Sequence, residues 1–344
     1  MRNYIPTLLT AVSLLFTFPI KAYEIEEKVV FAVDNPTANL QIFSTADRSL
    51  FAPIISAFQK ENPTVAVTYL IAGSSDIMEA IVEEGEVFDL VVSSAMDLQT
   101  KLANDGFARS YQSSVTDRLP DWGRWRNSVF AFTQEAAAIV VSAKEFSLGE
   151  VPKTREAILN AIREEPEKFQ GRIGTYDIRQ SGLGYLFATQ DSRTSNTYWR
   201  FIEVLGNFGV QLYASSSNMI DDVVSGKIAV AYNVLGSYAV ARTDVKDKIV
   251  IIEPEDYTTV MLRTALLMNN AAQAEEAEAF LDFLLSIAWR KPPPSSFLFP
   301  NKSAEEVDQS SNLRPIRLGP GLLVHLDKLK RSRFIKEWEA SLIR

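Results

Sequence analysis

The first third of the chain alternates between two hydrophobic periods. Residues 50–58 place apolar side chains at helical spacing, and this segment stops at Asn62-Pro63. Residues 65–71 place them at every second position, as a strand does, and residues 88–92 form a continuous apolar run typical of a strand buried on both faces. Strands that alternate with helices predict an α/β fold in which a parallel sheet carries helices on both faces.

The middle of the chain repeats this pattern. Two strand-like runs, 129–132 and 138–141, are expected to be joined by Thr133-Gln134-Glu135. A long helix over 271–289 ends at three prolines, and the tail over 322–343 is expected to be helical. Between these segments, short helices separate strands expected at 172–176, 228–232, 248–252 and 260–268.

The turn Gly73-Ser74-Ser75-Asp76 lies where the strand over 65–71 stops and a helix begins. A glycine lets a ligand approach the backbone, serine hydroxyls donate hydrogen bonds, and the first N–H groups of a helix lack partners within it. Such a junction can hold an anion. Ser74 and Ser75 are therefore candidate ligand-binding residues, with a plain helix cap as the alternative interpretation.

Similar junctions occur elsewhere in the chain. Ligands of open α/β sheets sit beyond the carboxyl ends of the strands, so we expect these junctions to face one cleft. Small donors that oppose one another suit a small oxyanion or a polyol. The further candidate ligand-binding residues are Ser44 and Thr45 after the first strand, Ser181 and Gly182 before a helix, and Tyr232, Asn233 and Ser237 after a later strand.

Arg179 is the candidate for recognition of charge on the ligand. It lies two residues before Ser181 at a predicted helix entrance. A guanidinium can bind a carboxylate or a phosphate through two parallel hydrogen bonds. A solvated surface arginine is the alternative interpretation. Arg48 is a weaker candidate, because its place in the first turn of a helix would equally leave it in solvent.

Charge and composition narrow the classes of partner. The chain carries 35 Lys and Arg against 43 Asp and Glu, a formal charge of −8, so a nucleic-acid partner is not expected. It has no cysteine and one histidine, His325, and so lacks the usual ligand sets for zinc, copper and iron–sulfur clusters. We expect His325 to be a helix residue, and we predict no cofactor.

Residues 1–22 resemble a secretory signal peptide. Arg2 is followed by an interrupted apolar run over 5–18 and then by Lys21-Ala22, which offers a small residue for cleavage. The apolar run is too short and too interrupted for a comfortable membrane span. The sequence therefore predicts an exported protein, with a retained N-terminal anchor as the alternative.

Catalysis has little support in the sequence. Asp76, Asp89, Glu135 and Asp177 are scattered carboxylates, and no nucleophile elbow, Walker loop or pair of histidines accompanies them. Gly182-Leu183-Gly184 lacks the rest of a dinucleotide-binding fingerprint. We expect no enzyme activity and no catalytic residue.

Several short motifs occur in the order seen in one family. Phe43-Ser44-Thr45, the run over 58–63, Gly73-Ser74-Ser75 and the segments 88–95 and 102–106 resemble the first lobe of the periplasmic solute-binding proteins of ABC importers. More narrowly, the chain is similar to the ferric-ion-binding-like branch, whose members bind ferric iron, phosphonates or sugar phosphates. The resemblance covers nearly the whole chain after the first 22 residues.

The resemblance implies two α/β lobes, each a mainly parallel sheet flanked by helices, that close over a ligand by hinge motion. The first lobe would comprise 38–130 and 262–344, and the second 131–261, with hinge segments near 130–136 and 253–262. It further implies a periplasmic monomer. This monomer would deliver a small ligand to an ABC permease in the inner membrane, or present it to a membrane sensor kinase.

Iron binding in this branch uses two adjacent tyrosines in the second lobe and often a histidine after the first strand. Here Tyr232 and Tyr238 are separated by five residues, and no histidine follows Ser44. Tyr232, Tyr238 and Glu135 could still supply oxygen ligands. We therefore expect a small anionic organic solute, phosphorylated or carboxylated, with ferric iron as the alternative.

Overall fold

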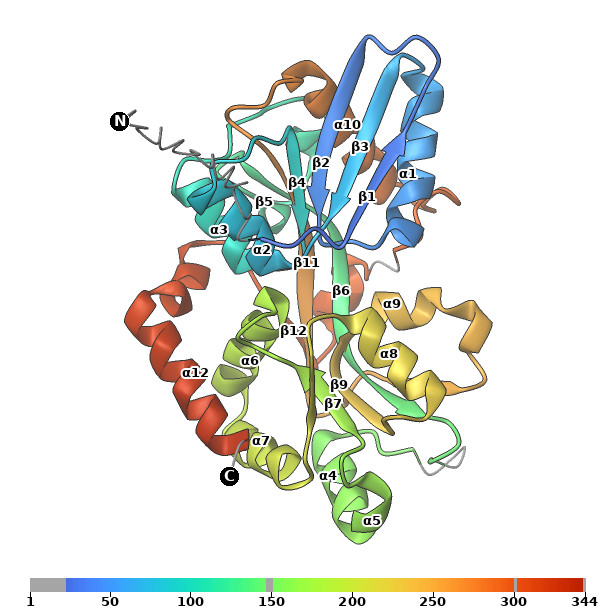
Figure 1. The fold of residues 1–344 in the computed structure, drawn as a ribbon, viewed down its shortest axis with the longest axis vertical. Coiled ribbons are helices and arrows are strands. Elements are labelled where there is room, and N and C mark those ends of the chain that lie inside the picture. The colour runs from blue at the N-terminus through green and yellow to red at the C-terminus, as the bar shows by residue number, and fades with distance from the viewer. Residues whose placement is uncertain (1–22, 147–150, 300–301, 343–344) are drawn as a thin grey trace, which may run out of the picture.

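A computed structural model describes residues 23–146, 151–299 and 302–342 of the chain. Figure 1 shows two α/β lobes, one above the other, with two strands running between them. The predicted fold class is confirmed. The expected signal peptide, residues 1–22, lies outside the described residues. None of the described helices is long and apolar enough to cross a membrane.

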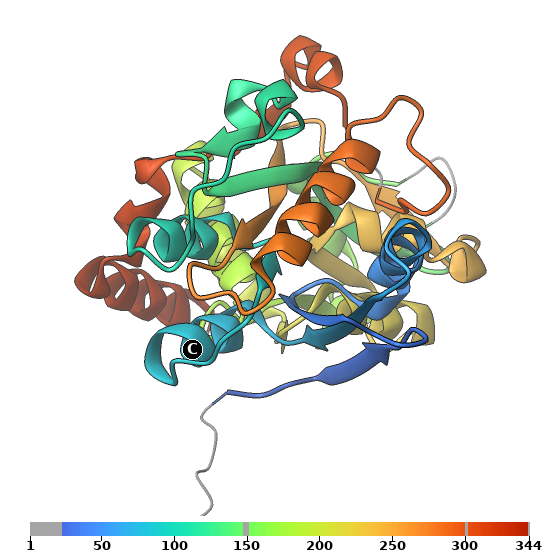
Figure 2. The same cartoon turned by 90° about the horizontal axis from the view of Figure 1, so that it is seen from above.

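The first lobe is built on a sheet with parallel strands at its centre. β2 (Ala38–Ser44) pairs in parallel with β3 (Val65–Ile71) and with β4 (Leu90–Ser93). β1 (Glu27–Phe31), which the hydrophobic pattern did not predict, adds an antiparallel edge strand to β3. Apolar clusters on both faces of the sheet are covered by helices (Figure 2). These helices are α1 (Arg48–Glu61), α2 (Ser74–Met78) with its π-helical continuation Glu79–Glu83, α3 (Met96–Asn104) and α10 (Ala274–Ala288).

The second lobe repeats this design. β7 (Ile173–Tyr176) pairs in parallel with β8 (Gln211–Tyr213) and with β9 (Val230–Leu235). β10 (Ile249–Ile252) pairs with residues 139–142 and is antiparallel to them. The helices of the second lobe are α4 (Arg155–Glu164), α5 (Pro166–Phe169), α6 (Gly182–Thr194), α7 (Tyr198–Asn207), α8 (Ser216–Ser225) and α9 (Gly236–Ala241).

Two long strands, β6 (Val129–Ser142) and β11 (Thr258–Leu267), run antiparallel and belong to both lobes. β6 pairs with β11 in its first half and with β9 further along. The expectation of two separate strands joined at Thr133-Gln134-Glu135 is wrong. The polar triplet continues the strand because its side chains find partners inside the protein, among them Arg263, which pairs with Glu135.

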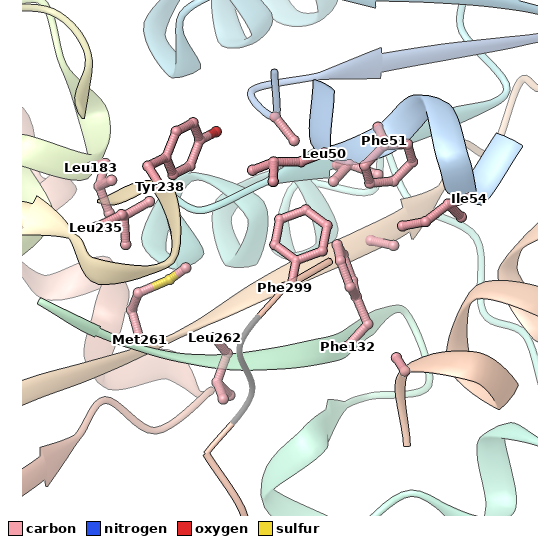
Figure 3. Packing of buried hydrophobic residues seen from close by; sticks show 14 of the residues in the cluster. Leu50, Phe51, Ile54, Phe132, Leu183, Leu235, Tyr238, Met261, Leu262 and Phe299 are labelled. Atoms are coloured by element: carbon pink, nitrogen blue, oxygen red, sulfur yellow. The ribbon is translucent and has the colours of Figure 1, made fainter. Parts of the chain in front are cut away.

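The apolar core continues from one lobe to the other. Figure 3 shows Phe51 of α1 and Phe132 of β6 close to Phe299, with Leu235 and Tyr238 of the second lobe further along the same cluster. The rings of Phe51 and Phe132 meet edge to face with centroids 6.3 Å apart. The lobes are therefore linked by packing as well as by the two crossing strands.

The tail after residue 302 contacts both lobes. β12 (Leu313–Pro315) pairs in parallel with the start of β11. A 3₁₀ segment, Pro320–Leu326, packs on α3 of the first lobe, and α12 (Lys328–Leu342) packs on α7 of the second. The tail also contains the short α11 (Ala304–Gln309), and β5 (Arg124–Trp125) pairs with β6 in the first lobe.

Two expectations about this tail are wrong. The segment 322–343 is not one helix, because Asp327 has an extended backbone that separates the 3₁₀ segment from α12. His325 accordingly lies in the 3₁₀ segment, where its carbonyl accepts a hydrogen bond from the Tyr185 hydroxyl at 2.6 Å. The tail also does not belong to the first lobe alone, since the buried side chain of Trp338 shares a core with α7.

Replacing Trp338 with alanine should lower the free energy of unfolding by about 3–5 kcal/mol, because it leaves a cavity in a closed core. Trp338 is only 1% exposed. Leu329→Ala on the same helix is the matched control, because Leu329 is 82% exposed, and it should change stability by less than about 0.5 kcal/mol. Urea unfolding followed by circular dichroism measures both, and equal losses would contradict the packing of α12 on the second lobe.

Candidate functional site

A small cavity of about 60 Å³ lies between the lobes. The turns that follow β2, β3 and β4 form one wall, and the turns that follow β7, β8 and β9 form the other. Carboxylates of Glu26 and Asp47 and phenols of Tyr176 and Tyr238 line it. Its aliphatic hydroxyls are those of Thr45, Ser74, Ser94, Ser181, Ser215 and Ser216. The structure thus brings the predicted residues Thr45, Ser74, Ser181 and Tyr238 together.

The lobes touch beside this cavity through the turn that begins α2. Ser74 Oγ accepts a hydrogen bond from the backbone N–H of Gly182 at 2.9 Å, and Ser75 Oγ donates to the carbonyl of Gln180 at 2.8 Å. A Cβ at position 182 would lie 2.6 Å from Ser74 Oγ and 2.6 Å from a methyl carbon of Leu98. A side chain at 182 would therefore force Ser74 or Leu98 to shift where the lobes touch.

Asp47 lies at the start of α1 and contacts the second lobe. Its Oδ2 accepts a hydrogen bond from Ser217 Oγ at 2.6 Å, and its backbone N–H donates to Tyr238 Oη at 3.4 Å. Burial raises the pKa of the Asp47 carboxyl, although Ser217 and Arg263 oppose the shift. Burial and the nearby Asp47 charge also raise the pKa of Glu26. The cavity therefore has an acidic end in which two carboxyls disfavour each other's charge.

Serine hydroxyls organise the helix starts of the second lobe at the cavity. Ser181 Oγ accepts from the N–H of Gly184 at 3.1 Å and caps α6, and Ser215 caps α8 in the same way. Ser216 Oγ lies 2.5 Å from Tyr176 Oη. The N-termini of α6 and α8 consequently face one cavity, where their first-turn N–H groups favour negative charge.

Thr45 lies in the wall of the cavity, and Ser44 lies behind that wall. Thr45 lines the cavity, and its Oγ1 accepts from the N–H of Ser94 at 3.2 Å. Ser44 is fully buried, and its Oγ accepts from Tyr69 Oη at 2.8 Å and from the N–H of Ala46 at 2.9 Å. Ser44 therefore shapes the turn after β2 rather than facing the cavity.

A buried ion pair joins the crossing strands. Arg263 Nε donates to Glu135 Oε1 at 2.9 Å, Arg263 Nη2 donates to Oε2 at 3.2 Å, and both side chains are 0% exposed. Thr133 Oγ1 donates to Oε1 at 2.6 Å, and Ser237 Oγ donates to Oε2. The structure uses the predicted site residues Glu135 and Ser237 in this pair. Neither is among the residues that line the cavity.

Neither predicted arginine reaches the cavity. Arg179 is exposed and donates to Asp177 at 2.8 and 2.6 Å and to Glu339 at 3.1 Å. Its charge is already matched by the carboxylates of Asp177 and Glu339. Arg48 is also exposed, and its ion pair with Glu27 spans 3.4 Å.

Tyr232 and Asn233 point away from the cavity. Tyr232 Oη donates to Asp191 at 2.7 Å, and Asn233 Nδ2 donates to the same carboxylate at 2.8 Å. Asn233 has φ 62°, a left-handed conformation that asparagine tolerates. The pairing of β6 with β9 shifts register near this point. This irregular backbone turns both side chains to the opposite face of the sheet.

The structure also adds cavity residues that the sequence reasoning missed. Glu26 lies before the first predicted strand, and Asp47 has the appearance of a helix cap. Tyr176 ends a predicted strand, while Ser215 and Ser216 follow the short β8, which the hydrophobic pattern did not predict. The run of three serines at 215–217 was the available signal, because it repeats the hydroxyl-rich turns of the first lobe.

The cavity is built for hydrogen bonding. Burial raises the pKa of the Tyr238 phenol to about 12, so this group is a neutral donor at ordinary pH. Within the described part of the chain, no group of three or more His, Asp or Glu side chains is arranged for a metal ion. Phenol, hydroxyl and carboxylate oxygens from two lobes can instead surround a small polar solute.

The comparisons with known proteins agree with this geometry. Residues 44–291 match the family model of the bacterial extracellular solute-binding proteins. No curated protein matches the chain. Among solved structures, the substrate-binding protein of an ABC transporter from Agrobacterium tumefaciens is 33% identical, with a TM-score of 0.85 over 93% of this chain and 99% of its own.

More distant structures share the fold. AfuA, a periplasmic binding protein from Actinobacillus pleuropneumoniae with fructose-6-phosphate bound, is 15% identical, with a TM-score of 0.71 over 89% of this chain and 99% of its own. A ferric binding protein from Campylobacter jejuni is 17% identical, with a TM-score of 0.66 over 89% of this chain and 100% of its own. Because the family model spans most of the chain and the 33% identical relative matches almost all of it, this protein belongs to the bacterial extracellular solute-binding proteins.

Proposed function

We propose that this protein captures a small, hydroxyl-rich organic solute with one anionic group and delivers it to an ABC importer. The observation that carries the proposal is the cavity at which hydroxyls from both lobes and the N-termini of α6 and α8 meet. Membership of the family and the likeness to the substrate-binding protein of a transporter support the importer.

The helix starts of the second lobe would bind the anionic group. First-turn N–H groups and the helix dipole favour a phosphate or a carboxylate. The hydroxyls of Ser181 and Ser215 stand at these helix starts. AfuA, which has the same fold and was solved with fructose-6-phosphate, supports a phosphorylated sugar as one suitable chemistry.

Asp47 and Glu26 would bind hydroxyls of the solute. Because Asp47 accepts from Ser217 in the first turn of α8, the anionic group would lie at the start of α6. An ionised carboxylate only accepts hydrogen bonds, so the hydroxyls of a sugar or polyol suit it. A second anionic group at this end would be repelled by both carboxylates. The acidic end therefore selects a solute whose charge is confined to one side.

Capture would proceed by opening and closing of the lobes. The cavity of about 60 Å³ is well below the roughly 300–1,000 Å³ of a typical ligand site, so a solute needs a more open arrangement to enter. Contacts from the solute to both lobes then favour closure, and the closed shape is what the membrane partner recognises.

Ferric iron is the second candidate, because the phenols of Tyr176 and Tyr238 share the cavity with the carboxylates of Asp47 and Glu26. These are hard oxygen donors of the kind that a trivalent iron ion prefers. Of the three iron ligands expected from the sequence, Tyr232, Tyr238 and Glu135, only Tyr238 lines the cavity. Titration with ferric nitrilotriacetate should give a tyrosinate-to-iron absorption band if iron is the cargo, and a colourless protein removes this candidate.

Presentation of the solute to a membrane sensor kinase would use the same cavity. Deletion of the gene separates the roles, because a transport protein is needed for uptake, whereas a sensing protein is needed for induction while existing uptake continues. The periplasmic location and the monomeric state likewise stay predictions.

Matched ligand pairs test the charge of the solute. Fructose 6-phosphate should raise the melting temperature more than fructose, and gluconate more than glucose, because only the charged members use the helix starts of the second lobe. A ligand at a hundred times its dissociation constant stabilises the folded protein by about 2.7 kcal/mol, which thermal shift resolves easily. Equal shifts within both pairs, or a shift with the neutral members alone, would contradict the anionic group.

Gly182→Ala should weaken binding of the best ligand about tenfold, because Ser74 and Leu98 must shift from its Cβ before the lobes can touch as they do here. Stability should not fall, since alanine favours a helix over glycine by up to about 1 kcal/mol. Isothermal titration calorimetry and urea unfolding measure the two effects. Gly321→Ala is the control, because a Cβ there meets nothing within 4 Å. An unchanged affinity in Gly182→Ala would show that binding does not use this closed arrangement.

A further inference from the structure

A second cavity, of about 350 Å³, lies where both lobes meet the tail. Its walls come from α2 with its π-helical continuation, from α3, from the start of α6 and from the residues around the start of α12. These elements lie together on the left side of Figure 1, at the level where the lobes meet. The cavity has the volume of an ordinary small-molecule site, and it shares no lining residue with the cavity between the lobes.

Asp97 is a buried carboxylate in the wall of this second cavity. It lies in the first turn of α3 and is only 2% exposed. Oδ1 accepts from the N–H of Leu98 at 2.9 Å, and among the described residues no other residue donates to Oδ2. Oδ2 is nevertheless not one of the buried atoms that lack both a partner and contact with solvent. The small exposed part of this carboxylate therefore opens into the cavity.

The charge of Asp97 has no close counter-charge. Burial raises the pKa of its carboxyl to about 7, and the N–H of Leu98 and the charge of Arg331 oppose the shift only in part. A cation against Oδ2 would stabilise the charged form. A bound ligand could supply that cation.

Two further carboxylates line the cavity. Glu79 and Glu83 stand at the two ends of the π-helical segment. Within the described part of the chain, neither forms an ion pair. Together with Asp97, they place three carboxylates without a paired cation around one space, which disfavours an anionic ligand.

The cations of the cavity are already engaged. Arg331 lies over the ring of Tyr185, 5.3 Å from its centre. Lys101 and Arg179 are paired with carboxylates that do not line the cavity, namely Asp105 for Lys101 and Asp177 and Glu339 for Arg179. The groups left without a partner therefore carry a net negative charge, and a positively charged ligand suits them.

The rest of the wall is largely apolar. Met78 and Val82 of the first lobe, Leu98 of α3 and Leu326 of the tail line it. Among the described residues, no group of three or more His, Asp or Glu side chains is arranged for a metal ion. An organic cation with an apolar body matches this wall, whereas a bare metal ion does not.

We propose that this second cavity binds a small organic ammonium ion. Its N–H groups donate to Asp97 Oδ2, and its apolar body packs between Met78, Val82 and Leu98. The site is separate from the cavity between the lobes and does not depend on which solute is transported.

Titration with 4-fluorobenzylamine at pH 8, followed by fluorine NMR, tests the proposal. We expect saturable binding of one molecule per chain, and the neutral 4-fluorobenzyl alcohol should bind about tenfold more weakly. Asp97→Asn should weaken binding of the amine about tenfold, the usual loss of a hydrogen bond to a charged group. This variant should not lower the melting temperature, because it removes a buried charge and keeps the oxygen that accepts from Leu98.

Glu84→Gln is the matched control. Glu84 directly follows the π-helical segment, is exposed and does not line the cavity. Its loss should leave the affinity nearly unchanged, because salt screens exposed charges. The amine should also bind several-fold more weakly at pH 6 than at pH 8, because an Asp97 carboxyl with a pKa of about 7 is mostly protonated at pH 6. Asp97→Asn should abolish this difference.

Four results would overturn the proposal. They are no saturable binding of the amine, equal affinity for the amine and the alcohol, equal affinity in Asp97→Asn and the unmodified protein, and an equal loss of affinity in Glu84→Gln and Asp97→Asn. None of them bears on the proposed transport function, because the two cavities share no lining residue.

Discussion

The pairing of Arg263 with Glu135 is the constraint on which the rest of the structure depends. Both charges are fully buried, on the two strands that belong to both lobes. Burying such charges is costly, and the carboxylate is stabilised here because Thr133 and Ser237 also donate to it. Loss of one partner in such a pair costs about 3–5 kcal/mol. The pair therefore fixes β6, β11 and the start of α9 as one unit beneath the cavity.

The two lobes could be predicted from the sequence because their signals are local. The helical spacing over 50–58 and the alternation over 65–71 each report on a single element, and α1 and β3 form there. The continuous crossing strand β6 could not be predicted in the same way. Thr133-Gln134-Glu135 has the composition of a turn, and only Arg263, which lies more than a hundred residues later, makes it a buried strand.

In the candidate site, too, the residues placed by local signals were predicted and those placed by distant partners were not. Ser74 and Ser181 follow from chain order, because turns after parallel strands meet at one edge, and the structure places both at the cavity. Arg179 has a plausible local position but forms an ion pair with Glu339, 160 residues away. Tyr232 is turned by the irregular backbone at Asn233. Such outcomes depend on distant partners and on φ angles, which hydrophobic spacing does not encode.

The hydrogen bonds along β11 attach its two ends to different lobes. At its lower end, Thr259 Oγ1 donates to Asp191 at 3.3 Å, which attaches the strand to the second lobe. At its upper end, the carbonyl of Thr264 accepts from Gln99 Nε2 at 3.1 Å, which attaches it to the first. The register shift between Arg263 and Thr264 lies at the boundary of this span. Each lobe therefore holds its own end of β11, and the span between the two attachments contains Arg263, whose pair with Glu135 joins β11 to β6.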